Sequence, residues 1–307
     1  MNQSALILSD GKPGHFHQSI ALCQHLGLPH KICEVAFPSR IHRLLSHAFD
    51  ACGVYSTFPF RTQRTPSNAD IVISTGSRTY YANKVTAKKL GAKSVAILAP
   101  RGYQWNFDAL LIPDYDHPPK QNNVIQLPIN ISYMAPELIE EKVNEFRQRH
   151  EPKTAQVHKV SILLGGDNKA GRMNPQEISH QLNQIQQKHP DSEIWVTTSR
   201  RTPQDVEADL RNRNFAYRHL YSEEPYNPIP AFIHLCDHLY VSTDSTSMLS
   251  ECVSNGKAKV SLIETTCSAK HKALASNLKQ LNLIDTDRKI DISEYLQKLN
   301  HLLQPDA

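Results

Sequence analysis

The stretch YVSTDSTSMLSECVSNG, residues 240–256, decides the fold. It begins as a short apolar and β-branched run and then breaks into small polar and acidic residues at 242–247. Apolar residues follow at helical spacing up to Asn255 and Gly256, a pair that commonly ends a helix. The pattern predicts a strand, a polar loop and a helix whose first turn is rich in hydroxyl groups.

The start of this helix has two interpretations. A helix N-terminus offers unpaired backbone N–H groups and the positive end of a dipole, which suits a phosphate group. Alternatively, Ser245 or Ser247 simply caps the helix. The local pattern leaves both open, so the rest of the chain has to decide between them.

The composition describes a soluble globular protein. The 307 residues are 39% hydrophobic and 21% charged, enough for two domains of ordinary size. A net charge of +4 is too small to indicate nucleic-acid binding by itself. The six cysteines form no C-x-x-C pair, and the chain shows no signal peptide and no apolar run long enough to span a membrane. We expect a cytoplasmic protein with reduced cysteines.

Short apolar strands alternate with loops and helices along the chain, in one series up to residue 127 and in a second from residue 159. This rhythm is typical of parallel sheets covered by helices. The sequence predicts an α/β fold with two Rossmann-like, doubly wound domains facing a cleft. The expected domains are 1–153 and 154–307, and the last helix, 293–303, could pack back on the first domain.

In open parallel sheets, ligands bind at the carboxyl ends of the strands. Three loops of the second series combine glycines for close backbone approach with cations and hydroxyls, which suits the diphosphate of a nucleotide sugar. We also predict a helix that begins at Pro203, its first residue, with Thr202 as its N-cap. Glu251 could accept hydrogen bonds from ribose hydroxyls, or could be an exposed acid. The predicted donor-binding residues are Gly165, Gly166, Lys169, Arg172, Ser199, Arg200, Arg201, Asp244, Ser245, Thr246, Ser247 and Glu251.

The first domain would hold the acceptor. Asp10 and His15 are candidate catalytic bases for an acceptor hydroxyl, although a surface histidine is the commoner case. The predicted acceptor-binding residues are Gly11, Gly14, Arg78 and Arg101, of which the arginines could instead bond neighbouring loops.

The segment 40–64 is basic and rich in aromatic residues. Within it, residues 40–49 form an amphipathic pattern, with Ile41 and Leu44 on one face and Arg40 and Arg43 on the other. It is either a solvated helix with an irregular loop or a surface that meets an anionic membrane or an acidic acceptor.

No residues indicate a bound metal or another cofactor. Two D-x-D triplets, at 114–116 and 285–287, could in principle hold a divalent ion, but such triplets are frequent by chance. Histidines and cysteines lack zinc spacing, and no G-x-S-x-G sequence suggests a serine hydrolase.

Several blocks together resemble the ELM1-like family, which is described as a mitochondrial-fission family or as glycosyltransferases. They are SDGKPGHFHQS (9–19), STGSR (74–78), APR (99–101), LLGGDNKAGR (163–172), TTSRRTP (197–203) and residues 227–257. The first loop departs from the more usual Gly-His-Glu-Asn-Gln, and LAPR (98–101) stands where Gln-Asp-Pro-Arg is typical.

The resemblance implies a GT-B-like fold with an NDP-sugar in the C-terminal domain. The plant relative is associated with mitochondrial fission, and some bacterial relatives with sugar addition to lipopolysaccharide. We therefore expect a metal-independent glycosyltransferase acting on a cell-envelope glycolipid or polysaccharide, with peripheral membrane contact through 40–64 and no nucleic-acid partner. The alternatives are a non-catalytic adaptor that binds a membrane or partner, and an NDP-sugar epimerase.

Overall fold

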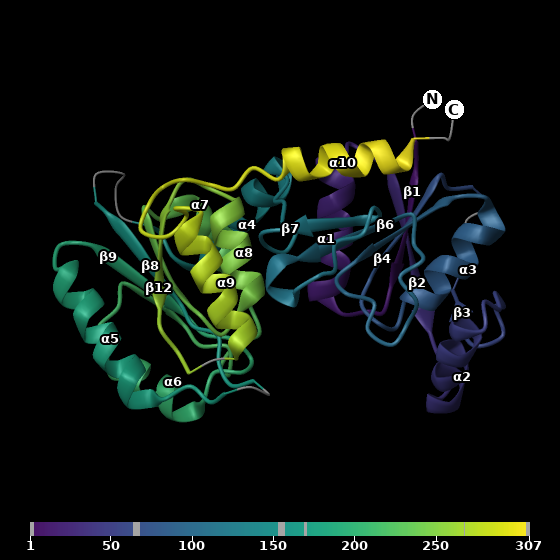
Figure 1. Ribbon diagram of the computed structural model, residues 1–307. Helices are drawn as coiled ribbons and strands as arrows, with labels where there is room; N and C mark the ends of the chain where they lie inside the picture. The colour runs from purple at the N-terminus through teal and green to yellow at the C-terminus, as the bar shows by residue number, and fades with distance from the viewer. Residues whose placement is uncertain (1–2, 64–67, 153–156, 169–170, 267, 305–307) are drawn as a thin grey trace. The chain divides into compact units, whose positions relative to one another are not determined.

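The computed structural model describes residues 3–63, 68–152, 157–168, 171–266 and 268–304. The chain divides into two compact units, each with its own sheet of mostly parallel strands (Figure 1). The first comprises residues 1–133 and 291–307, and the second comprises residues 134–290. None of the described helices is both long and apolar enough to cross a lipid bilayer.

The first unit contains seven described strands in the order β3-β2-β1-β4-β5-β6-β7. All neighbours run parallel except β2 and β3. The strands are β1 (Ala5–Ser9), β2 (His30–Ala36), β3 (Arg61–Thr62), β4 (Ile71–Thr75), β5 (Lys93–Ile97), β6 (Ala109–Pro113) and β7 (Val124–Leu127). The helices are α1 (Pro13–His25), α2 (Arg40–Ala51), α3 (Tyr80–Leu90), the 3-10 turn η1 (Asp114–Asp116) and α10 (Ser293–Leu303).

The second unit has five described strands, all parallel, in the order β10-β9-β8-β11-β12. They are β8 (Lys159–Leu163), β9 (Glu193–Thr197), β10 (Tyr217–His219), β11 (His238–Ser242) and β12 (Lys259–Ile263). The helices are α4 (Pro136–Arg149), α5 (Pro175–Lys188), α6 (Gln204–Arg211), α7 (Ile229–Leu235), α8 (Thr246–Ser254) and α9 (Ala269–Gln280).

Burial explains why the strands form where the sequence predicts them. Every residue of β1, β4, β6, β8, β9 and β11 is buried, as expected for parallel strands covered on both faces. The two sheets carry separate apolar cores, one around Leu6 and Tyr80 and one around Ile162 and Leu182. The two α/β units are therefore doubly wound and Rossmann-like.

Helices α4 and α10 each belong to a different unit from the element that precedes them in sequence. Helix α4 lies in the second unit, because the fully buried Phe146 packs on Trp195 and Phe232 at ring-centroid distances of 4.8 and 5.4 Å. Helix α10 lies in the first unit, where it contacts β6 and β7 and Lys298 Nζ donates to the Val124 carbonyl at 2.7 Å. The chain therefore passes between the units near residue 133 and again near residue 290.

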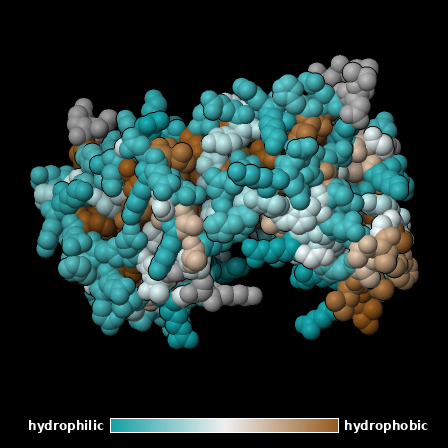
Figure 2. Space-filling model, viewed as in Figure 1, coloured by the Kyte–Doolittle hydropathy of each residue, from teal (hydrophilic) through white to brown (hydrophobic). Residues whose placement is uncertain are grey.

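Helix α2 turns polar side chains inward. Asp50 forms a buried ion pair with Lys84 at 2.7 Å, and the buried Ser46 hydroxyl contacts the Tyr103 hydroxyl at 3.0 Å. The apolar side chains Ile41 and Leu44 are 67% and 69% exposed, and they contribute to an apolar patch over α2 (Figure 2). The amphipathic pattern of residues 40–49 thus places its apolar face on the surface.

Candidate functional site

The glycine loop that follows β8 lies where the strand order of the second unit reverses, between β8 and β11. Gly165 N donates to Ser242 Oγ, and Gly166 N donates to Asp244 Oδ2, both at 2.7 Å. A Cβ on Gly165 would lie 2.0 Å from Asp244 Oδ2, so only glycine fits there. The loops after β8 and β11 are thereby locked together at the position where open α/β sheets bind ligands.

The side chains of Arg201 and Ser199 donate hydrogen bonds to backbone carbonyls of this glycine loop. Arg201 Nη1 donates to the carbonyls of Gly166 and Asp167 at 3.0 and 3.1 Å, and its Nη2 lies 3.4 Å from Asp244 Oδ2. Ser199 Oγ donates to the Gly165 carbonyl at 2.7 Å. Both side chains therefore position the loop, in addition to any contact with a ligand.

Thr202 is not the N-cap of the following helix, as the sequence predicted. Helix α6 begins at Gln204 and Pro203 is its N-cap residue. The Thr202 hydroxyl instead donates to the Gly165 carbonyl. The threonine thus bonds the glycine loop, and the prediction is wrong because the helix begins at Gln204, one residue later than predicted, which places Pro203 at the cap position.

The cationic side chains of these loops differ in whether they are already bonded to other protein groups. Arg172 and Arg200 are exposed, and no hydrogen bond or ion pair engages their side chains within the described part of the chain. Lys169 lies outside the described residues. Arg172 and Arg200 are therefore available for an anionic ligand, whereas Arg201 is partly committed to the loop.

The N-terminus of α8 completes this edge. Ser245 caps the helix by accepting from Met248 N at 3.4 Å, while Thr246 is half-buried and Ser247 exposed in the first turn. Asp244 Oδ1 is buried without a hydrogen-bond partner among the described residues. The backbone N–H groups in the first turn of α8 can therefore bind an anion, and Asp244 Oδ1 can accept a hydrogen bond from a ligand.

Glu251 lies one turn further along α8. Its carboxyl is half-buried, and burial raises its pKa to about 7. No hydrogen bond to this carboxyl occurs among the residues that the structure describes. A carboxylate in this state gains from a hydroxyl donor, because hydrogen bonding favours its charged form.

His271 joins the same edge and was missed by sequence reasoning. Ser268 caps α9 and bonds His271 Nδ1 at 2.7 Å, and the His271 ring also hydrogen-bonds the Asp244 backbone. Burial lowers the pKa of His271. The signal was the Ser-x-x-His pattern after the strand at 259–263, which is too common to identify a site alone.

In the first unit, Asp10 and His15 lie together at the carboxyl end of β1. His15 Nδ1 lies 3.1 and 3.2 Å from the two carboxylate oxygens of Asp10, whose side chain is only 1% exposed. The His15 ring packs directly over Gly76, where a Cβ would lie 2.5 Å from its Cε1 atom. This arrangement fixes the ring by Nδ1 and leaves Nε2 for other partners.

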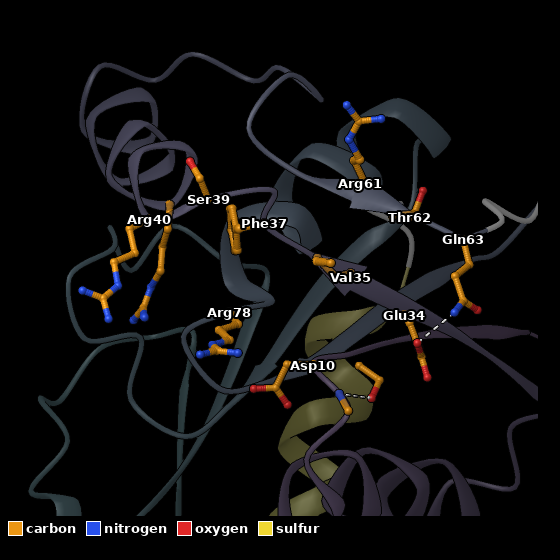
Figure 3. A pocket seen from close by; sticks show the side chains of 14 residues that line it. Asp10, Glu34, Val35, Phe37, Ser39, Arg40, Arg61, Thr62, Gln63 and Arg78 are labelled. Carbon is orange, nitrogen blue, oxygen red and sulfur yellow. Dashed lines mark hydrogen bonds between the residues drawn. The ribbon is translucent and has the colours of Figure 1, made fainter.

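The other predicted acceptor residues divide into two groups. Gly11 and Arg78 line a cavity of about 710 Å³ beside Asp10 (Figure 3). Arg101 is 80% exposed and pairs with Asp116 at 3.3 Å, outside that lining. Gly14 lies in the first turn of α1 with open space around it. The cavity also receives Arg40, Arg43 and Arg61, and we call it the arginine pocket.

One carboxylate of each D-x-D triplet is engaged within the protein. Asp116 pairs with Arg101, and Asp285 accepts from the Ser261 hydroxyl. Among the described residues, no group of three or more His, Cys, Asp or Glu side chains is arranged to hold a metal ion.

Two solved structures share this fold along the whole chain. One is the S. aureus MnaA–UDP structure, with 11% sequence identity, 98% of this chain and 96% of that chain covered, and a TM-score of 0.50. The other is UDP-GlcNAc 2-epimerase from Neisseria meningitidis bound to UDP-GlcNAc, with 11% identity, 99% of each chain covered and a TM-score of 0.50. At this identity the likeness shows the GT-B-like fold alone.

None of the curated protein sequences matches the chain. The family described as Mitochondrial fission ELM1 does match, over residues 13–301, which is nearly the whole chain. This extent confirms the resemblance carried by the loop blocks, and the protein belongs to the Mitochondrial fission ELM1 family.

Proposed function

We propose that the protein is a glycosyltransferase that moves a sugar from a nucleoside diphosphate to an acceptor hydroxyl. The Asp10–His15 pair carries the proposal, because a histidine oriented by a buried carboxylate is suited to proton transfer.

The loops after β8, β9 and β11 and the first turn of α8, which we call the donor edge, suit a nucleoside diphosphate. The first turn of α8 and the exposed Arg172 and Arg200 would meet the diphosphate charge, and Glu251 would accept from the ribose hydroxyls. Both fold neighbours were solved with UDP or a UDP-sugar bound, which supports the choice of donor class.

In the proposed reaction, His15 Nε2 takes the proton of the acceptor hydroxyl while Asp10 stabilises the resulting imidazolium. The acceptor oxygen forms a bond to C1 of the sugar, and the bond from C1 to the diphosphate oxygen breaks. Arg172, Arg200 and the α8 N-terminus would stabilise the departing diphosphate, so we propose that no metal is required.

Binding tests the donor half of the proposal. We expect one of UDP, GDP, CDP or CMP to raise the melting temperature and to show saturation-transfer signals with the full-length protein. Arg200→Gln should weaken that binding, whereas Arg288→Gln, which removes an exposed arginine outside the proposed donor edge, should not. Failure of all four nucleotides to bind would contradict the proposal.

Turnover tests the catalytic half. With the identified donor and envelope glycolipids as acceptors, His15→Ala should lower kcat by about 100-fold to 10,000-fold. Asp10→Asn should also lower it, whereas the exposed neighbour His17→Gln should retain activity. EDTA should leave the rate unchanged. Wild-type activity in His15→Ala would refute the role of the pair, and consumption of the sugar nucleotide without acceptor would favour the epimerase alternative.

We further propose that the acceptor is presented at a membrane surface. Ile41, Leu44 and Phe58 are more than 60% exposed, and Arg40 lies on the same helix as the first two. Apolar side chains beside cations are typical of surfaces that bind anionic lipids. This arrangement supports a cytoplasmic protein that binds the inner face of the cytoplasmic membrane and acts on a cell-envelope glycolipid.

Vesicle sedimentation tests the membrane contact. The full-length protein should sediment with vesicles that contain phosphatidylglycerol, and Ile41→Ser with Leu44→Ser should reduce the bound fraction. Leu281→Ser is the matched control, because Leu281 is an exposed leucine of the second unit. Equal binding by all variants would refute the contact through α2.

A further inference from the structure

The arginine pocket is strongly cationic and largely unpaired. No ion pair or hydrogen bond engages the Arg40, Arg61 or Arg78 side chain within the described part of the chain, and Arg43 Nη2 only contacts Ser77 Oγ at 3.3 Å. Guanidinium groups that line a cavity of about 710 Å³ without an acidic partner can form charged hydrogen bonds to a bound anion.

The lining also contains two carboxylates, each of which is hydrogen-bonded to a neighbouring side chain. Asp10 bonds His15, and Glu34 accepts from Gln63 Nε2 at 2.9 Å. In Figure 3 the Arg78 side chain lies beside Asp10 and the Arg40 side chain lies further out on the same side of the pocket, while Arg61 projects from the other rim with its guanidinium turned away. The anion site is therefore the part of the pocket shared by Arg40, Arg43 and Arg78.

A helix terminus adds to this charge. Ser39, the N-cap of α2, also lines the pocket, so the positive end of a 12-residue helix lies at its wall. The helix is held firmly from beneath by the Asp50–Lys84 pair and by His47 Nδ1, which lies 2.8 Å from the Gly102 carbonyl. Arg40 and Arg43 are thus carried on a fixed support.

We infer that the arginine pocket binds a phosphate group of the acceptor. A carboxylate is satisfied by one bidentate arginine, whereas three arginines and a helix N-terminus suit a doubly charged phosphate. Asp10 lies in the same lining and holds His15, so a phosphate bound here brings a neighbouring hydroxyl of the same molecule towards the proposed base. The acceptor assignment rests on the proposed function; the phosphate site itself does not.

The test uses inorganic phosphate as the probe. Signals of the arginine Nε–H groups are followed by NMR as phosphate is added to the full-length protein, with chloride at matched ionic strength as the reference. We expect phosphate-specific shifts from Arg40, Arg43 and Arg78. Arg43→Gln and Arg78→Gln should each weaken binding about tenfold, the change expected for one charged hydrogen-bonding group.

Arg288→Gln is the matched control for the loss of one positive charge, and its phosphate affinity should equal that of the wild type. Shifts no larger than those with chloride, or unchanged affinity in both pocket variants, would overturn the inference. The phosphate titration contains no nucleotide, so its result is independent of the donor test. If the protein fails to bind phosphate while Arg78→Gln still binds nucleotide, the phosphate inference has failed and the donor proposal stands. If nucleotide does not bind but phosphate does, the donor proposal has failed.

Glycerol 3-phosphate and nanodiscs containing phosphatidic acid then distinguish the source of the phosphate. Binding of either one that is lost in Arg78→Gln supports the site, and the stronger of the two identifies a soluble or a lipid-linked phosphate. Binding of neither overturns the inference.

Discussion

The buried pair Lys84–Asp50 fixes helix α2, and Lys84→Met should show how much α2 depends on it. Both side chains are 2% exposed, and Lys84 Nζ lies 2.7 Å from Asp50 Oδ1. Lys84 Nζ also donates to the Gln104 carbonyl at 2.8 Å, and Asp50 Oδ2 accepts from Gln104 N at 2.6 Å. Methionine keeps the length of the side chain but leaves a buried carboxylate without its counter-charge.

Lys84→Met should lower the free energy of unfolding by about 3–5 kcal/mol, the usual cost of breaking a buried ion pair by removing one partner. In Lys84→Met/Asp50→Leu, no uncompensated charge remains, and the deficit is the loss of hydrogen-bond partners for the Gln104 N–H and carbonyl groups. The double variant should therefore lose only about 1–3 kcal/mol. The double variant is thus predicted to be more stable than the single variant.

Hydrogen exchange of the α2 amides, measured across a urea series, reports the stability of this helix without assuming that the two units unfold together. Lys89→Met is the control, because Lys89 is an exposed lysine on the same helix as Lys84 and should change stability by less than about 0.5 kcal/mol. A loss below about 1 kcal/mol in Lys84→Met, or a double variant less stable than the single one, would refute the reasoning.

Three further predictions concern the second unit. Gly165→Ala should abolish nucleotide binding and destabilise the unit by at least about 2 kcal/mol, because its Cβ would displace the Asp244 carboxylate from the Gly166 N–H. Affinity for a bound UDP-sugar, measured by calorimetry, should rise about tenfold from pH 6 to pH 8 as Glu251 ionises around pH 7. The free energy of unfolding of this unit should fall by about 2–3 kcal/mol between pH 6.5 and pH 4.5. Burial lowers the pKa of His238 to about 3, so in this range His238 binds a proton in the unfolded chain but not in the folded one.

The sign of the His238 effect follows from the neutral ring being the buried form. Its contribution is fully present above the unfolded pKa of 6.5 and is lost as the pH falls towards the folded value. Urea unfolding of His238→Gln at both pH values isolates this term from that of other groups, and an equal acid loss in the variant would contradict it. For the other two, Gly14→Ala should not destabilise the protein, and Glu251→Gln should give a pH-independent affinity.

The sheets were predictable because each central strand is a short apolar run bounded by loop residues. The runs at 71–75 and 159–163 can be buried on both faces, which is the condition of a parallel strand. Helix 293–303 was also found with the predicted bounds. Local patterning was sufficient for these elements because the residues that the pattern marks as apolar are the ones that are buried.

The orientation of α2 could not be predicted from its own sequence. The pattern at 40–49 predicts an amphipathic helix, but which face is buried depends on partners distant in sequence, above all Lys84 and Tyr103. A short hydrogen-bonding run such as β3 is equally hidden, because two residues carry no periodicity. In both cases the information lies in the contact and not in the segment.

The candidate site was predicted in part. The sequence indicated which loops would gather at the strand ends, and Asp10 and His15 as candidate bases, but not that they bond each other. It also could not show that Ser199 and Arg201 would bond a glycine loop some 35 residues earlier. Residue types indicate the chemistry available, whereas the fold decides which group faces a ligand and which supports its neighbour.

The discontinuous first unit has a consequence for synthesis on the ribosome. Its sheet is complete in sequence by residue 127, but α10, which packs on β6 and β7, is translated only after the entire second unit. The second unit is continuous in sequence and can fold as soon as residue 290 has emerged, as domains generally fold as units. Helix α10 therefore joins the first unit only after the second unit has been translated, so nascent chains would pass through a stage in which β7 lacks its contact with this helix.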